Sequence, residues 1–188
     1  VTAVSGRSIS YAIGCTNESS AFASGGIAPL RYVTVGEDAD TAKTISGNIV
    51  IASNIATLTS TGHGFVVGDV VVIAGLAQKE ANGAFAITAV ADANTLAVNL
   101  TKAAVASAAN VADVANVSST AVAGSPTAIR VIEAIPTVDS TRVSFSNSSP
   151  FTMTVNPTAT LPGSTAVHAR VGVGAIRDNK SNSYAGIA

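Results

Sequence analysis

Apolar and polar residues alternate over short runs along most of the chain, and each run is bounded by Gly, Asn, Asp or Ser. Alternation with a period of two is typical of strands, and the flanking turn formers mark their ends. Such runs occupy residues 32–35, 48–51, 56–61, 70–73, 84–90 and 95–100, and again 128–134, 141–146, 151–155 and 166–173. Recurrent prolines in the last third break helices and suit strands joined by loops. We therefore predict an all-β protein: a small antiparallel β-barrel plus a second β-sandwich-like region, with an extended N-terminal arm and a C-terminal tail.

The same pattern divides the chain into five segments. Residues 1–47 are predicted to form the N-terminal arm and the first strands, and residues 48–100 the small β-barrel module. Residues 101–124 form a connector, in which alanines at helical spacing favour a short helix while valines favour a strand or an ordered loop. Residues 125–176 form the second β-rich region, and the polar residues 177–188 the C-terminal tail.

The barrel module has a predicted core and predicted turns. Strands from 56 to 100 wrap around Leu58, Phe65, Val71, Ile73, Phe85, Ile87, Leu96 and Val98. The glycines of Gly62-His63-Gly64 permit a tight reversal with positive φ. We expect Val66 and Val67 to pack inward with Phe65. In the strand 84–90, alternation places Ala89 on the core face and Val90 on the other. Asp69 and Asp92 are expected to orient turns through their carboxylates.

Composition changes the picture of the surface. Hydrophobic residues make up 47% of the chain, but charged residues only 11%, against a usual share of about 25%. A surface with so few charges is poorly protected against self-association, which indicates that much of it is covered by other chains. The net charge of −1 offers no basic patch for nucleic acid or an anionic membrane. No uncharged apolar run reaches the length of a membrane span.

Two histidines and one cysteine are the first candidates for chemistry. His63 could act as a base or a ligand, but a base needs a partner and a pocket. The other histidine, His168, is far away in the sequence, so we interpret His63 as a turn residue hydrogen-bonded to nearby backbone. Cys15 is the single cysteine, so it forms no intrachain disulfide and belongs to no Cys/His metal cluster. We interpret it as an inert thiol.

The remaining candidates are weaker. A phosphate-binding loop would need a Lys and a following helix, which the glycines at 62, 64 and 68 lack, and the pair Gly172 and Gly174 lacks the third glycine of a dinucleotide fingerprint. The cluster Glu37, Asp38 and Asp40 lacks the further ligands of a calcium loop, which favours a solvated loop. Tyr11, Tyr32 and Tyr184 are too far apart for a base-stacking platform, and Arg170, Arg177 and Lys180 are expected to belong to a solvated tail. We therefore predict no catalytic, cofactor-binding or metal-binding residues, no cofactor and no enzymatic activity.

One stretch resembles a known kind of module. The segments TSTGHGFVVGDVVVIAG, ANGAFAITAV and ANTLAVNL lie between Thr59 and Leu100. They combine a His-Gly turn, a Gly-Asp before a valine strand, an Asn-Gly before the next strand and an Asn-Thr before the last. This resembles a small β-barrel module of structural proteins of tailed double-stranded DNA bacteriophages, where it occurs in tail, baseplate and capsid-decorating proteins. Residues 1–47 and 101–188 carry no such motif.

The resemblance implies a non-enzymatic virion protein, and most of all a capsid decoration (cement) protein that binds and stabilises the assembled head. Binding only to the assembled shell would stabilise it by mass action. The expected partners are the major capsid protein and further copies of this chain, a trimer being one option, without direct contact to nucleic acid or membrane. The expected location is the virion, assembled in the host cytoplasm, with intersubunit contacts from residues 1–30 and the tail. Two alternatives stay open: a tail tube or other tail or head–tail connector subunit, and a host-surface binding module.

Overall fold

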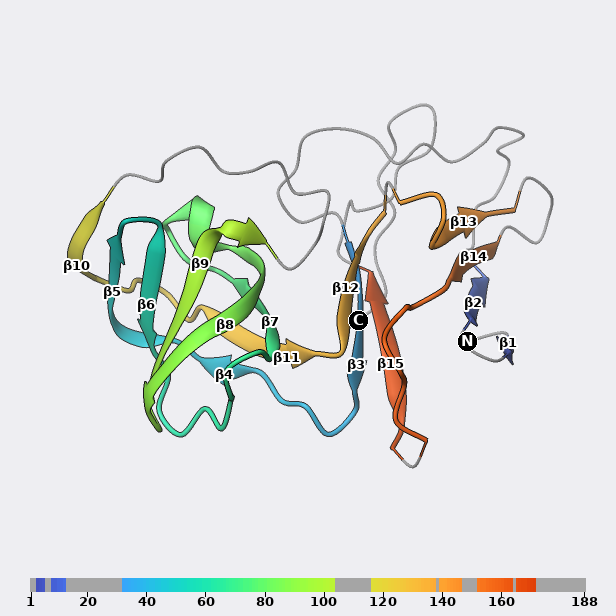
Figure 1. The fold of residues 1–188 in the computed structure, drawn as a ribbon, viewed down its shortest axis with the longest axis horizontal. Helices are drawn as coiled ribbons and strands as arrows, with labels where there is room; N and C mark the ends of the chain where they lie inside the picture. Colours follow the sequence, from blue (N-terminus) through green and yellow to red (C-terminus); the bar gives the residue numbers. More distant parts are fainter. Residues whose placement is uncertain are drawn as a thin grey trace. The chain divides into compact units, whose positions relative to one another are not determined.

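The computed structural model describes residues 3–5, 8–12, 32–103, 116–137, 139–146, 152–163 and 165–171. Within these residues the chain forms strands and one short 3-10 helix, with no α-helix, so the prediction of an all-β protein is confirmed. The chain divides into two compact units (Figure 1). We call Asp38–Val131 the barrel unit, and Val1–Glu37 together with Ile132–Ala188 the sandwich unit.

The barrel unit contains one curled antiparallel sheet. Its elements are β4 (Lys43–Thr44), β5 (Ser46–Ala52), β6 (Ile55–Thr59), β7 (Val70–Ala74), the 3-10 helix η1 (Lys79–Ala81), β8 (Gly83–Asp92), β9 (Thr95–Ala103), β10 (Val117–Ala121) and β11 (Thr127–Val131). The strand order is β10-β5-β6-β9-β8-β7-β11-β4. The chain runs from β4 directly into β5 through Ile45, whose N–H donates to the Pro126 carbonyl at 2.8 Å. Because β4 and β5 lie near opposite ends of the order, this continuity curls the sheet into an open, barrel-like form.

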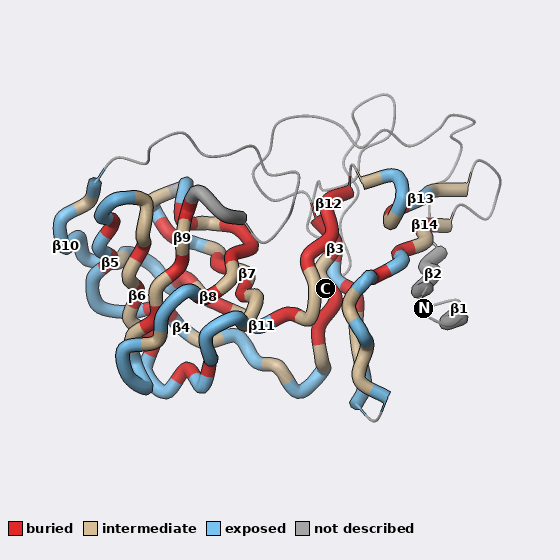
Figure 2. Tube along the Cα trace, viewed as in Figure 1, coloured by how far each residue is buried: buried red, intermediate tan, exposed pale blue. Residues whose placement is uncertain are grey.

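The core of the barrel unit follows from the alternation of its strands. All eight residues that the pattern placed in the core are buried, together with Ile45, Ile49, Ile51 and Leu100. In β6 and β7 every second residue is buried, as expected for a sheet with one face on a core. Figure 2 shows this alternation as buried and half-buried segments that succeed one another along the strands. Each fully buried Ile or Leu contributes about 1.5–3 kcal/mol of hydrophobic stabilisation.

Two expectations about side-chain direction in this unit are wrong. Val66 and Val67 are 60% and 61% exposed, because a tight turn points both outward: Asp69 accepts the Val66 N–H at 2.9 Å and its own N–H donates to the Val66 carbonyl at 3.1 Å. In β8 the pairing with β9 shifts register between Ile87 and Ala89. A register shift of one residue exchanges the two faces, so Ala89 is exposed and Val90 packs against the core.

The sandwich unit contains two antiparallel sheets. Its strands are β1 (Ala3–Ser5), β2 (Ser8–Ala12), β3 (Tyr32–Glu37), β12 (Glu133–Pro136), β13 (Val143–Phe145), β14 (Thr152–Val155) and β15 (Val167–Val171). One sheet has the order β1-β2-β14-β13 and the other β12-β3-β15. Both sheets supply one core: Val33, Val35, Ile135, Ala169 and Val171 from β12-β3-β15, and Val143, Met153 and Val155 from the other. A core shared by two sheets is the arrangement of a sandwich.

The barrel unit is inserted between two neighbouring strands of the sandwich unit. β3 and β12 pair antiparallel, with Val35 opposite Glu133 and Tyr32 opposite Pro136, and the chain between them is the barrel unit. This unit extends beyond the predicted module 48–100, because β4, β10 and β11 complete its sheet. In the predicted arm, residues 3–5 and 8–12 form strands that are paired within a sheet. Most of the connector (104–115), residues 13–31 and the tail 177–188 lie outside the described residues.

Candidate functional site

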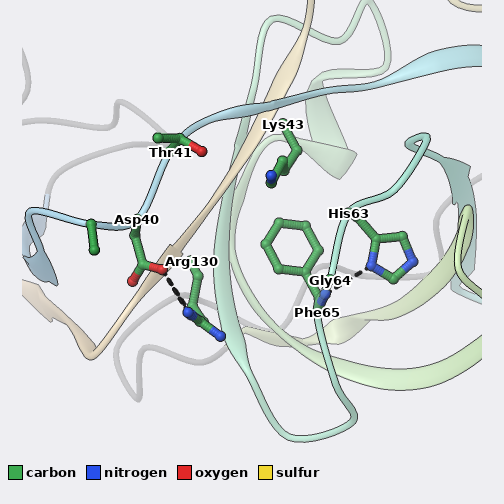
Figure 3. A pocket seen from close by; sticks show the side chains of 8 residues that line it. Asp40, Thr41, Lys43, His63, Gly64, Phe65 and Arg130 are labelled. Carbon is green, nitrogen blue, oxygen red and sulfur yellow. Dashed lines mark hydrogen bonds and ion pairs between the residues drawn. The ribbon is translucent and has the colours of Figure 1, made fainter.

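A pocket of about 240 Å³ opens on the barrel unit. Its lining side chains come from three separate segments: Asp40, Thr41 and Lys43 from the acidic loop and β4, His63 and Phe65 from the turn after β6, and Arg130 from β11. Figure 3 shows the Phe65 ring between them, with Asp40, Lys43 and Arg130 around it. The sheet brings these segments together because β11 pairs with β4 on one side and with β7 on the other.

An ion pair forms one wall of the pocket. Arg130 donates to Asp40 Oδ1 from Nη2 at 2.7 Å and from Nε at 3.0 Å, and its Nη1 lies 3.8 Å from Asp69 Oδ2. The Asp40 side chain is only 10% exposed, so the expectation of a solvated loop is wrong at this residue. The Arg130 side chain is 44% exposed, and solvent-screened pairs of this kind contribute about 0–1 kcal/mol to stability. The pair fixes the position of both side chains more than it stabilises the fold.

His63 is a structural residue of the turn. Its side chain is 3% exposed, and its Nδ1 accepts the Phe65 N–H at 2.9 Å. The two rings stack with centroids 5.3 Å apart and an interplanar angle of 18°. The interpretation of His63 as a turn residue bonded to nearby backbone is confirmed. Since Nδ1 accepts, the proton of the neutral ring lies on Nε2, which is buried and has no hydrogen-bond partner in the described part of the chain.

The other turn residues also have the predicted roles. Gly62 and Gly64 adopt φ of +60° and +70°, the left-handed conformation that glycine adopts without strain. Asp69 holds the turn at Val66, as described above. Asp92 Oδ1 accepts the Asn94 N–H at 2.7 Å, and Asn94 in turn accepts the Gly62 N–H at 3.0 Å. The two turns are therefore hydrogen-bonded to each other.

Lys43 and Arg130 are pocket residues that sequence reasoning missed. Lys43 is half-buried and lines the pocket. Its ammonium makes no ion pair or hydrogen bond with any described residue. No local motif identifies either cation as a pocket residue, because Arg130 pairs with Asp40, which lies 90 positions earlier in the sequence. Only the strand order brings the two cations to one place.

The remaining sequence candidates do not join this pocket. His168 lies in β15 of the sandwich unit, whereas His63 lies in the barrel unit, and Glu37 ends β3. Tyr32 is buried, and this burial raises the pKa of its phenol. Arg170 is exposed, as expected, but it lies in strand β15 rather than in a tail. Of Tyr11 the structure describes the backbone pairing alone. The following residues lie outside the described ranges: Cys15, Gly172, Gly174, Arg177, Lys180 and Tyr184.

The described residues were compared with the requirements of a metal site and of a membrane-spanning helix. No three His, Cys, Asp or Glu side chains in them gather closely enough to hold a metal ion. No helix in these ranges is long and apolar enough to cross a membrane.

Comparisons of the chain with protein-family models, with curated proteins and with solved structures found no match.

Proposed function

We propose that this chain is a non-enzymatic structural protein of a tailed bacteriophage virion, and specifically a capsid decoration protein that binds and stabilises the assembled head. The proposal begins with the resemblance of residues 59–100 to virion β-barrel modules. Partners are the major capsid protein and further copies of this chain, and the location is the virion.

The observation that carries the proposal is the use of the motif's polar residues. His63 and Asp69 accept backbone N–H groups within their turn, and Asp92 does so within its own. Asn82 accepts the Leu76 N–H and donates to the Leu76 carbonyl, both at 2.8 Å. Side chains that are engaged in this way build a stable barrel. The motif therefore supports a scaffold interpretation better than a reaction centre, where polar groups face the substrate.

Composition supports the same proposal. With 11% charged residues, the chain has a surface suited to burial against other subunits rather than to a free monomer. The barrel unit is inserted in the chain between the paired strands β3 and β12. An insertion of this kind adds a second binding surface and leaves the sheet of the sandwich unit paired. Such a chain can contact a shell with one unit and its own copies with the other.

The test is co-sedimentation of the purified chain with empty, fully expanded capsids that lack decoration, with purified tails as the control. We expect saturable binding to capsids alone and a raised melting temperature of the shell. The variant His168→Ala, which changes the histidine of the sandwich unit, is expected to bind as the wild type does. An enzymatic activity that this variant loses would contradict the proposal.

A tail tube or connector subunit is the second candidate. It is favoured by the two sheets of the sandwich unit, since a tube subunit needs a sheet to line the lumen. Failure to bind capsids or tails, with rings or tubes formed by the pure chain in electron micrographs, would replace the decoration proposal by this one.

A further inference from the structure

We infer that the pocket beside the His63 turn is a docking site for a carboxylate side chain, carried by the protein surface to which this chain binds, with Lys43 as its ion partner. The identity of that surface rests on the proposed function. The preference of the pocket for a carboxylate rests on its own residues.

The charges of the pocket point to an anion. Arg130 is paired with Asp40 and lies near Asp69, so its charge is compensated within the unit. Lys43 is half-buried and has no such compensation from a described residue. Partial burial of an unpaired ammonium is unfavourable, and an incoming carboxylate relieves this cost by forming the missing pair. Among the residues that line the pocket, Lys43 and Arg130 are cationic and Asp40 is the one anion, so Lys43 is the cation left without a counter-ion.

The size and shape of the pocket limit the ligand. Its volume of about 240 Å³ is below the about 300–1,000 Å³ of sites for drug-sized ligands and cofactors. It accommodates the end of an Asp or Glu side chain. The Phe65 ring lies between the charged side chains (Figure 3) and lines the pocket. Because Phe65 is only 6% exposed, it contributes a small apolar part of the lining. At Gly64 an added Cβ would meet nothing within 4 Å, so the approach past this turn is open.

The neighbouring turn indicates that the carboxylate belongs to a protein. Val66 and Val67 follow Phe65 directly and are 60% and 61% exposed. Their turn is held in place by the Asp69 carboxylate and by the Gly68 N–H, which donates to the Ile87 carbonyl at 2.9 Å. A free anion would leave both valines in water. A protein surface covers them while its carboxylate enters the pocket, and the preformed turn lowers the entropic cost of binding.

The pocket itself is tested with N-acetyl-aspartate amide as a probe of the acidic side chain. This probe is titrated at constant ionic strength into the ¹⁵N-labelled full chain. We expect saturable shifts of the Gly64 and Phe65 amides with millimolar affinity. We expect these shifts to be lost in Lys43→Met and kept in Arg170→Met, which removes the same charge from the exposed face of β15. Absence of the shifts in the wild type, or equal shifts in Lys43→Met, overturns the inference.

The docking role is tested by co-sedimentation of the same variants with expanded capsids. We expect Lys43→Met to bind shells at least about tenfold more weakly and with a smaller salt dependence, and Arg170→Met to bind as the wild type. The double variant Val66→Ser, Val67→Ser should weaken shell binding but leave the probe titration unchanged. If Lys43→Met binds shells as tightly as the wild type, the docking role is overturned. It is also overturned if Lys43→Met changes only the self-association of the chain. If the wild type binds no shells, the proposed function fails, and the probe titration still decides on the carboxylate site.

Discussion

At the scale of single residues, the barrel depends on glycines for two different reasons. Gly75 has φ of +89°, and a Cβ added there would lie 3.0 Å from the Pro126 Cα, a backbone atom. Gly64 has φ of +70° with open space around it. We expect Gly64→Ala to lower the free energy of unfolding by about 1–2 kcal/mol, the cost of the left-handed conformation alone. Gly75→Ala should lower the free energy of unfolding by clearly more, because the added Cβ also contacts the Pro126 backbone. Urea denaturation of both variants measures this, and equal losses would contradict the close contact.

His63 provides a second prediction at this scale. His63→Ala removes a buried ring that stacks on Phe65 and leaves the Phe65 N–H without its acceptor. A cavity and an unsatisfied buried donor together should lower the free energy of unfolding by about 2–4 kcal/mol. The half-buried His168 serves as the comparison, and His168→Ala should cost less. A loss at position 63 no greater than at 168 would show that the turn does not need the ring.

At the scale of elements, one turn of the sandwich unit makes stability depend on pH. Asp139, between β12 and β13, accepts from the Thr141 hydroxyl at 2.6 Å and from Arg142 Nε at 2.7 Å. These bonds, that from Thr141 first, lower the pKa of Asp139 below its ordinary value of 3.8. Folding thus favours the ionised form, so the stabilisation is complete above the ordinary pKa and is lost as the pH falls through the folded pKa. We expect the difference in unfolding free energy between wild type and Asp139→Asn to be constant near neutrality and to shrink in acid. A difference that persists unchanged in acid would refute this.

The elements also show which features a sequence specifies locally. The barrel strands and the eight core residues were predictable, because alternation and turn formers are local signals. The exposure of Val66 and Val67 was not, because it depends on the Asp69 carboxylate bonding backwards to close the turn. The face of Val90 depends on a register shift against β9. The pocket was hidden for the same reason: Asp40 and Arg130 meet only through the order of strands in the sheet.

At the scale of the whole molecule, the insertion of one unit into another explains why segment boundaries read along the sequence differ from structural ones. The sequence shows the orderly stretch 48–100 as a module. The compact unit starts ten positions earlier, at Asp38, and ends at Val131. Its first and last strands, β4 and β11, pair with each other, although Lys43 and Ala128 are far apart in the chain. Alternation along a strand carries no information about a partner this distant.

This architecture predicts that the barrel unit folds alone. Its chain enters and leaves at adjacent strands of the sandwich unit, β3 and β12, and its own core is continuous. We expect the fragment 38–131 to give a dispersed NMR spectrum and a cooperative thermal transition. The fragment 48–100 is the matched control. It lacks β4, β10, β11, the start of β5 and the end of β9, so Ile73 loses its partner Ala128, and the fragment should remain unfolded. If 38–131 is unfolded as well, the barrel unit needs the rest of the chain; if 48–100 folds equally well, β4, β10 and β11 are dispensable to it.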